Sequence, residues 1–157
     1  MALRKILTEE ESALHKVCKP VTSFDRKLHN LLDDMADTLL EAQGVGLAAP
    51  QIGIIRRVVV VDTGDGLLEL VNPVLVETSG EQIGAEGCLS IPGKYALVKR
   101  PNYAKVRAQD RDGEWFEVEG EELMARCFCH ELEHLDGHLY TEKMERFLTE
   151  EELNQED

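Results

Sequence analysis

Apolar side chains recur at helical spacing in the segment that follows Ser23. Ser23 or Asp25 can cap a helix that extends to about Gln43, and Gly44 is a typical C-terminal stop. The predicted apolar face consists of Phe24, Leu28, Leu31, Leu32, Met35 and Leu39. We expect this helix to pack against the core, because it carries no evident chemistry of its own.

Between this helix and a second helical stretch, the pattern becomes that of β-strands. Short β-branched or alternating runs are separated by glycine-containing turns. The predicted strands are 58–62, 67–77, 81–85, 95–99, 104–110 and 114–119. Their spacing is typical of antiparallel hairpins without βαβ crossovers. Strands grouped between two helices indicate an α+β fold.

The second helical stretch begins near residue 120, ends at Gly137 and contains an HExxH motif. His130 and His134 are one turn apart, so their imidazoles face the same side. One metal ion can bind one nitrogen of each ring, and a neighbouring carboxylate can accept a proton. Glu131 and Glu133 flank the histidine stripe on opposite sides, so spacing alone does not decide which one is the base.

A catalytic site of this kind needs a third protein ligand. Cys127 is on the histidine face but about 7.5 Å back along the axis, beyond the reach of its side chain. Cys129 points roughly 100° or more away from the histidines, and Cys18 lies in an unpatterned segment. Cys88, in a predicted glycine- and proline-bounded loop, is the best remaining candidate.

Composition narrows the functional class. The chain has 157 residues, a single-domain length, and its net charge of -14 argues against binding DNA or RNA through phosphates. No apolar run is long enough to span a membrane, and the N-terminus lacks signal-peptide features, so we expect a cytoplasmic protein. In that compartment its four cysteines are not expected to form disulfides.

One further segment is rich in small residues but apolar: Gly44-Val45-Gly46-Leu47-Ala48-Ala49-Pro50-Gln51. Small residues permit close approach of another strand or of a ligand. Composition alone favours a simpler interpretation, a tight connection between a helix and a strand.

Three segments, in this order and separation, resemble the motifs of the peptide deformylases. They are the segment 44–51, then Glu86-Gly87-Cys88-Leu89-Ser90, then His130-Glu131-Leu132-Glu133-His134-Leu135-Asp136-Gly137. The resemblance implies an enzyme that removes the N-formyl group from the N-terminal formylmethionine of nascent polypeptides and releases formate. It also implies one domain over residues 1–148, with antiparallel sheets packed around a central C-terminal HExxH helix and with an N-terminal helix.

The resemblance also assigns roles. The implied metal ligands are Cys88, His130 and His134, with Fe(II) expected in the cell and Zn(II), Ni(II) or Co(II) able to replace it. Glu131 is then the base, and the Gln51 amide and the Leu89 backbone N–H are the expected donors to the oxyanion. The implied substrate-binding residues are Gly44, Val45, Gly46, Gly87, Arg100 and Cys127.

The chain departs from the family pattern in its third motif and in its tail. Glu133 stands where the family usually has Asp, which predicts an intact site with altered supporting contacts. Some relatives dock on the ribosome through a long basic C-terminal helix, whereas the tail here, 149–157, is short and acidic. The expected partners are therefore a formylmethionyl peptide and, transiently, the ribosome, with no DNA and no membrane.

Two rival interpretations use the same residues. A zincin-like peptidase shares HExxH and would cleave unformylated peptides. A deformylase-like protein that only binds metal or peptide would need neither Glu131 nor Gln51, so the presence of both favours an enzyme.

Overall fold

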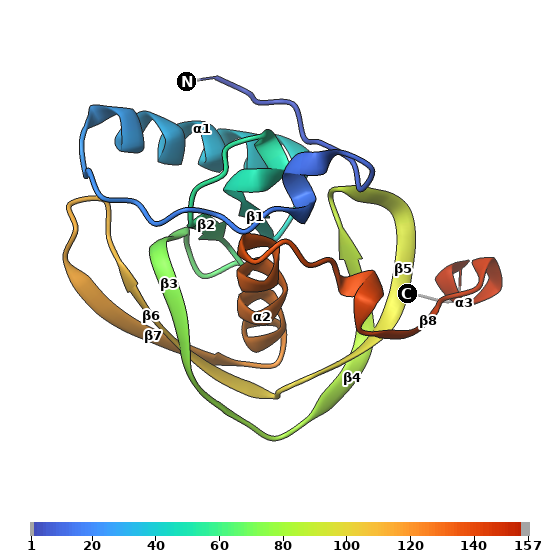
Figure 1. Cartoon of the computed structure of the whole chain (residues 1–157). Helices are drawn as coiled ribbons and strands as arrows, with labels where there is room; N and C mark the ends of the chain where they lie inside the picture. The colour runs from blue at the N-terminus through green and yellow to red at the C-terminus, as the bar shows by residue number, and fades with distance from the viewer. Residues whose placement is uncertain (1, 155–157) are drawn as a thin grey trace.

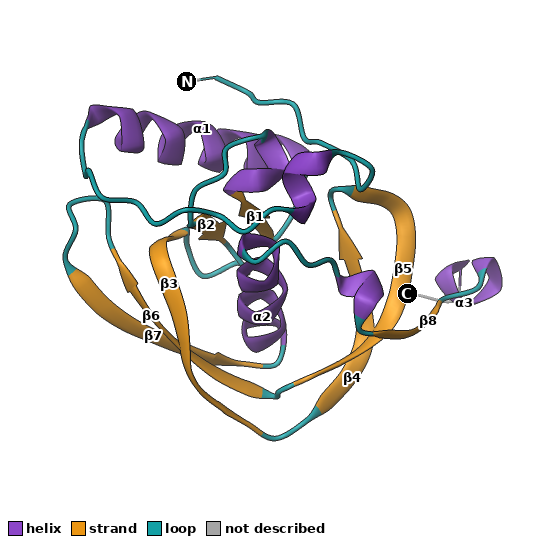
Figure 2. Ribbon diagram, viewed as in Figure 1, coloured by secondary structure: helices purple, strands orange, loops and turns teal. Residues whose placement is uncertain are grey.

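The computed structural model describes residues 2–154 and has the expected α+β fold, with antiparallel strands around one central helix (Figure 1, Figure 2). The α-helices are α1 (Arg26–Ala42), α2 (Leu123–Leu135) and α3 (Glu150–Asn154). The 3-10 helices are η1 (Ser12–His15), η2 (Ala49–Ile52) and η3 (Tyr140–Glu142). The strands are β1 (Gly46–Ala48), β2 (Val58–Val61), β3 (Leu68–Ser79), β4 (Gln82–Cys88), β5 (Ile91–Arg100), β6 (Tyr103–Gln109), β7 (Trp115–Glu121) and β8 (Met144–Phe147).

The strands form two antiparallel sheets that lie on either side of α2 (Figure 1). One sheet has the order β1-β2-β3-β6-β7, and the other has the order β4-β5-β8. β3 and β4 are consecutive in the chain but belong to different sheets, so the turn between them carries the chain from one side of α2 to the other. Within residues 2–154 every pair of named strands is antiparallel, which agrees with the predicted absence of βαβ crossovers.

Helix α1 covers the β1–β2 end of the larger sheet. Asp25 caps it as predicted, since its carboxylate accepts a hydrogen bond from the Leu28 N–H. The predicted stop is displaced by one residue, because Gln43 rather than Gly44 takes the left-handed conformation, with φ 55°. The buried side chains of the α1 face are Leu28, Leu32, Met35 and Leu39, which pack with β1 and β2 residues in one core cluster.

Helix α2 begins three residues later than the predicted start near Gly120. β7 continues through Glu121, which pairs with Tyr103, and Glu122 adopts a positive φ of 53° at the junction. Glu121 and Glu122 therefore precede the helix, and the prediction that it begins near residue 120 was wrong. Pairing with β6 extends the strand across a segment whose local sequence also suits a helix.

The interior of α2 packs against the larger sheet. Four of its buried apolar side chains share one cluster with residues of β1, β2, β3 and β6: Ala125, Cys127, Phe128 and Leu135. This packing orients the helix, and with it the HExxH motif, relative to β1. Within residues 2–154 no helix is long and apolar enough to cross a membrane.

All four cysteines are free. The predicted acidic tail is described as far as Asn154, where α3 forms beside β8, and the Arg146–Glu152 ion pair joins the two elements. Residues 155–157 of that predicted tail lie outside the described residues.

Candidate active site

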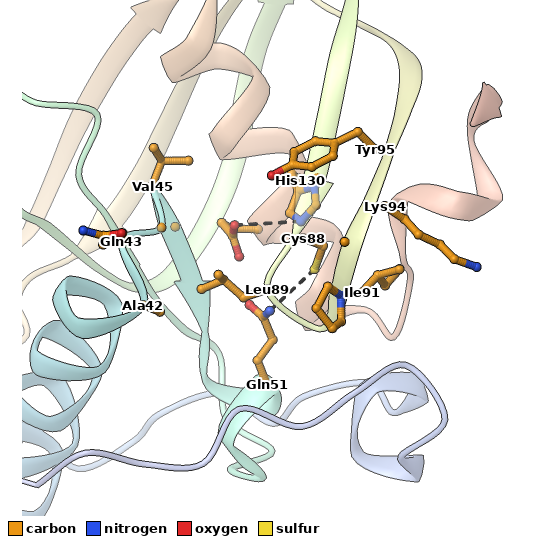
Figure 3. Close-up of a pocket in the computed structure, with 16 residues that line it drawn as sticks. Ala42, Gln43, Val45, Gln51, Cys88, Leu89, Ile91, Lys94, Tyr95 and His130 are labelled. Atoms are coloured by element: carbon orange, nitrogen blue, oxygen red, sulfur yellow. Dashed lines mark hydrogen bonds and ion pairs between the residues drawn. The ribbon is translucent and has the colours of Figure 1, made fainter. Parts of the chain in front are cut away.

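Three segments far apart in the chain meet at a cavity of about 480 Å³ (Figure 3). The end of α1 and β1 contribute residues 42–46, η2 contributes Gln51, the β4–β5 hairpin contributes 87–89 and 91–95, and α2 contributes His130 and Glu131. The cavity therefore gathers residues from all three motifs of the sequence.

Cys88, His130 and His134 lie together. Their potential ligand atoms are all within 4.8 Å of one another, and the Cys88 sulfur is 3.4 Å from His134 Nε2. Both histidines are buried, and Cys88 is partly buried. Cys88 is the last residue of β4, at a register irregularity after Gly87, and not in a loop as predicted. One thiolate and two imidazoles at this spacing fit a single divalent metal ion.

Glu86 determines which nitrogen of His130 faces this cluster. Its carboxylate is 2.5 Å from His130 Nδ1, which leaves Nε2 for a metal. Burial alone would raise the pKa of Glu86, but hydrogen bonds from His130 and Arg100 lower it to about 2, so the carboxylate is ionised. An ionised acceptor at Nδ1 favours the tautomer with its proton on Nδ1 and a free lone pair on Nε2.

The fold places Glu131 and Glu133 in different surroundings, although they are only two residues apart on α2. Glu131 lines the cavity, is 4% exposed and lies 4.0 Å from His130 Nε2. Burial raises the pKa of Glu131 to about 7. Glu133 is directed away from the cavity and forms ion pairs with Arg100 at 2.8 Å and Lys143 at 2.6 Å. Only Glu131 is therefore in a position to exchange a proton with a molecule in the cavity.

Both the oxygen and the nitrogen of the Gln51 side-chain amide form hydrogen bonds. Its oxygen accepts a hydrogen bond from the Ala48 N–H at 2.9 Å, and its nitrogen donates to Ser90 Oγ at 3.0 Å. The same nitrogen points at the Cys88 sulfur, 3.6 Å away (Figure 3). These contacts fix the orientation of the amide beside the Cys88 sulfur. Leu89, the other predicted donor residue, also lines the cavity.

Gly46 and Gly87, in the first two motifs, lie in close contact with other residues, as small residues permit. A Cβ on Gly46 would lie 2.6 Å from a carboxylate oxygen of Glu131, and one on Gly87 would lie 2.6 Å from the Tyr95 ring. The interpretation of residues 44–51 as a connection is also correct in part, because they lead from α1 into β1 and η2.

Two predicted substrate-binding residues do not line the cavity. Arg100 is 3% exposed and binds Glu86 and Glu133. Cys127 packs in the core cluster, and burial raises the pKa of its thiol to about 12, so it stays protonated. The other predicted members of the set, Gly44, Val45, Gly46 and Gly87, line the cavity.

Sequence reasoning missed two residues at the site, Glu86 and Tyr95. Glu86 lies two residues before Cys88 on a strand, and the regular period of a strand puts such residues on the same face, although the register irregularity after Gly87 interrupts that period here. This period could have pointed to Glu86 as a support for the metal cluster. Tyr95 comes from the far strand of the β4–β5 hairpin, opposite Gly87, and only the strand register brings it to the cavity.

The fold and the cavity define the class of protein: an α+β protein with a Cys/His/His donor set and a buried glutamate on an HExxH helix. Comparison with known proteins identifies the family. The sequence profile of the family described as Polypeptide deformylase matches residues 3–150. The chain is 57% identical over 145 residues to the peptide deformylase of Agathobacter rectalis. The aligned region covers 92% of this chain and 92% of that protein.

Solved structures agree with the sequence comparison. The crystal structure of a peptide deformylase from Legionella pneumophila has a TM-score of 0.88 and 43% identity, and covers 96% of this chain and 89% of that one. The peptide deformylase of Thermotoga maritima has a TM-score of 0.89 and 37% identity, with 92% and 99% covered. The chain belongs to the peptide deformylase family. It is accordingly a hydrolase that removes the N-formyl group from the formylmethionine of nascent polypeptides.

Proposed function

We propose that Cys88, His130 and His134 hold one divalent metal and that Glu131 is the general base of deformylation. The observation that carries this proposal is the meeting of the three donor atoms within 4.8 Å, next to a buried glutamate that lines the same cavity. A divalent metal at such a site lowers the pKa of the water it holds and polarises the formyl oxygen. Fe(II) is the proposed ion in the cell, and Zn(II), Ni(II) or Co(II) can replace it because this donor set suits several borderline metals.

The protein's own groups perform the proton transfer and stabilise the developing charge. Glu131 accepts the proton of the attacking water and returns it to the departing amine. The Gln51 amide and the Leu89 backbone N–H donate hydrogen bonds to the oxyanion that forms from the formyl group. Because Gln51 is held by Ala48 and Ser90, its donor is already oriented before the reaction.

We further propose that the peptide binds as an extended strand between β1 and β4. Each of these is the terminal strand of its sheet, and the residues beside them, 44–46 and 87–89, line the cavity. A free strand edge can pair with the backbone of an added peptide whatever its side chains are. The methionine side chain would then occupy the apolar part of the cavity near Val45 and Leu89.

The proposed setting is the cytoplasm, where formylated chains emerge from ribosomes. Any contact with the ribosome is proposed to be transient and independent of the C-terminal segment, since α3 contains three consecutive glutamates and rRNA is anionic. Binding to DNA and to membranes is not part of the proposed function.

The test is formate release from formyl-Met-Ala by protein purified anaerobically, with unformylated Met-Ala as the control substrate. Glu131→Ala is expected to retain its metal and to lose about 10²- to 10⁴-fold in kcat. A variant with full activity and full metal content would refute the assignment of the base. Cleavage of the unformylated peptide would instead favour a peptidase.

The ligand set has its own test in the metal content of two cysteine variants. Cys88→Ala is expected to lose the metal, whereas Cys127→Ala, one turn before His130 on α2, is expected to keep it. Loss of metal from the second variant alone would return the third ligand to Cys127.

A further inference from the structure

The two halves of the metal site belong to different packing units. His130 and His134 are on α2, whose buried apolar side chains pack with the five-stranded sheet. Cys88 ends β4, and it packs against a separate cluster formed by Ile91, Ala96, Val98, Leu139 and Tyr140. Among the described residues, that second cluster contains no apolar side chain of α2. Apolar packing therefore does little to set the position of β4 relative to α2.

Buried polar contacts cross this interface instead. Arg126, on α2 and 6% exposed, donates from Nη1 to Glu86 Oε2 at 2.7 Å and to the Val98 carbonyl at 3.2 Å. Its Nη2 donates to Gln82 Oε1 at 3.3 Å. Gln82 and Glu86 are on β4, and Val98 is on β5. A single side chain of the helix is thus bonded to both strands of the hairpin that carries Cys88.

A second arginine makes the complementary connection from the sheet. Arg100, on β5, binds both oxygens of Glu86 at 3.1 and 2.6 Å, and it reaches α2 through Glu133 at 2.8 Å. Arg126 and Glu133 are seven residues apart on α2, about two helical turns. The hairpin is consequently joined to the helix at two levels, with His130 between them.

Glu86 transmits the position of Arg126 to the metal ligands. It lies two residues before Cys88 on β4 and accepts the hydrogen bond of His130 Nδ1. Arg126 precedes His130 by four residues, so both side chains are on the same face of α2. Displacement of Glu86 would therefore turn the His130 ring and move the Cys88 sulfur at the same time.

We propose that Arg126 is a positioning residue for the metal site: by holding Glu86 and β4 against α2, it sets the separation between the Cys88 thiolate and the two imidazoles. The inference rests on the proposed ligand set. Arg126 does not line the cavity, so its effect on the reaction is exerted through Glu86 and not through contact with substrate.

The test uses enzyme loaded with Co(II), whose thiolate-to-cobalt absorption reports directly on the Cys88–metal contact. Arg126→Met is expected to weaken or shift that absorption and to release cobalt to a chelator about 10- to 100-fold faster. The value of kcat should fall while KM changes little. Arg126→Lys, which keeps the charge but not the set of contacts, is expected to restore part of the slow release.

Arg111→Met is the matched control. Arg111 binds Glu69 and Asp33 and so joins α1 to β3, and none of these three residues lines the cavity. It has two carboxylate partners, just as Arg126 has polar partners on two strands. The control is expected to lower thermal stability without changing the cobalt absorption or its rate of release. If Arg126→Met behaves in the same way as this control, the proposal is wrong.

Two further outcomes are distinguishable. If wild-type enzyme lacks the thiolate-to-cobalt absorption, or Cys88→Ala keeps it, the ligand set of the proposed function fails before Arg126 is considered. If Arg126→Met does not fold, Gln82→Ala removes one anchor of the Arg126 guanidinium and is expected to speed cobalt release by a smaller factor. Release from Gln82→Ala at the wild-type rate would then overturn the inference.

Discussion

Gly46 leaves almost no space between β1 and the proposed base, which allows a direct test of how closely Glu131 must be positioned. A Cβ at this residue would lie 2.6 Å from Glu131 Oε2 and 2.9 Å from its Cδ and Cγ. Ordinary contacts of a Cβ begin at about 3.4 Å. In Gly46→Ala, either the strand or the glutamate must move.

The strand is the more rigid of the two. β1 is paired with β2 at all three of its residues, and these β2 partners, Val59, Val60 and Val61, are fully buried. The carboxylate is therefore expected to withdraw by roughly 1 Å, a displacement that can lower catalysis about 100-fold, or raise the barrier by ~2.7 kcal/mol. The crowding also costs about 1–3 kcal/mol of folding stability.

The assay is kcat and KM for formyl-Met-Ala, with metal content and thermal stability measured on the same preparations. Gly44→Ala is the matched control in the same segment. The three atoms nearest to its new Cβ all belong to flexible side chains: Leu89 Cδ1 at 2.8 Å, Leu39 Cδ1 at 3.1 Å and Leu89 Cγ at 3.3 Å. Because Leu89 lines the cavity, this variant should change KM and retain kcat.

A metal-loaded Gly46→Ala enzyme with wild-type kcat would refute the reasoning. That result would mean that the position of Glu131 tolerates a shift of this size or that Glu131 is not the base. An equal loss of kcat in both glycine variants would show that the effect is general to the segment and unrelated to Glu131.

Three more outcomes are expected. Phe128→Ala, at a fully buried position in the main core cluster, should lower the free energy of unfolding by about 3–5 kcal/mol in urea titrations, and a loss below about 1 kcal/mol would contradict the packing described. The hydrogen bond from Arg4 lowers the pKa of Asp34, so its stabilising effect is present above the unfolded value of ~3.9 and is lost as the pH falls through the lower folded value. Asp34→Asn should therefore be less stable than wild type at neutral pH, and the difference should shrink in acid; a constant difference across that range would exclude this linkage. Removal of the metal by a chelator should leave the far-UV spectrum intact, because the apolar clusters do not depend on it, and Co(II) at 100 times its Kd should restore ~2.7 kcal/mol of stability.

Local pattern was sufficient for most of the fold elements. The spacing of Leu28, Leu32, Met35 and Leu39 predicted α1, and alternation with glycine turns predicted β2 to β7, because side-chain period follows directly from backbone geometry. The short strands β1 and β8 were not predicted. Element ends were less accurate. The start of α2 was misplaced because pairing of Glu121 with Tyr103, a contact between distant residues, extends β7 at the expense of the helix.

The metal cluster was accessible to sequence reasoning in two stages. Helical spacing alone put His130 and His134 together, and elimination pointed to Cys88. The fold then brings the Cys88 sulfur to 3.4 Å from His134 Nε2. Arg100 could not be assigned in this way, since nothing in its neighbours along the chain indicates that it lies buried between Glu86 and Glu133.

Sequence by itself therefore determined the kind of fold, the two histidines on one helical face and the small residues that line the approach to them. Only the tertiary structure decided which glutamate faces the cavity, which nitrogen of His130 is free, and that ion pairs hold the Cys88 hairpin against α2. The physical reason is the separation along the chain over which each kind of interaction acts. Periodicity and propensity act between residues within a few positions of one another, whereas a metal site of three ligands depends on where two packing units meet, and that is set by burial and pairing across the whole chain.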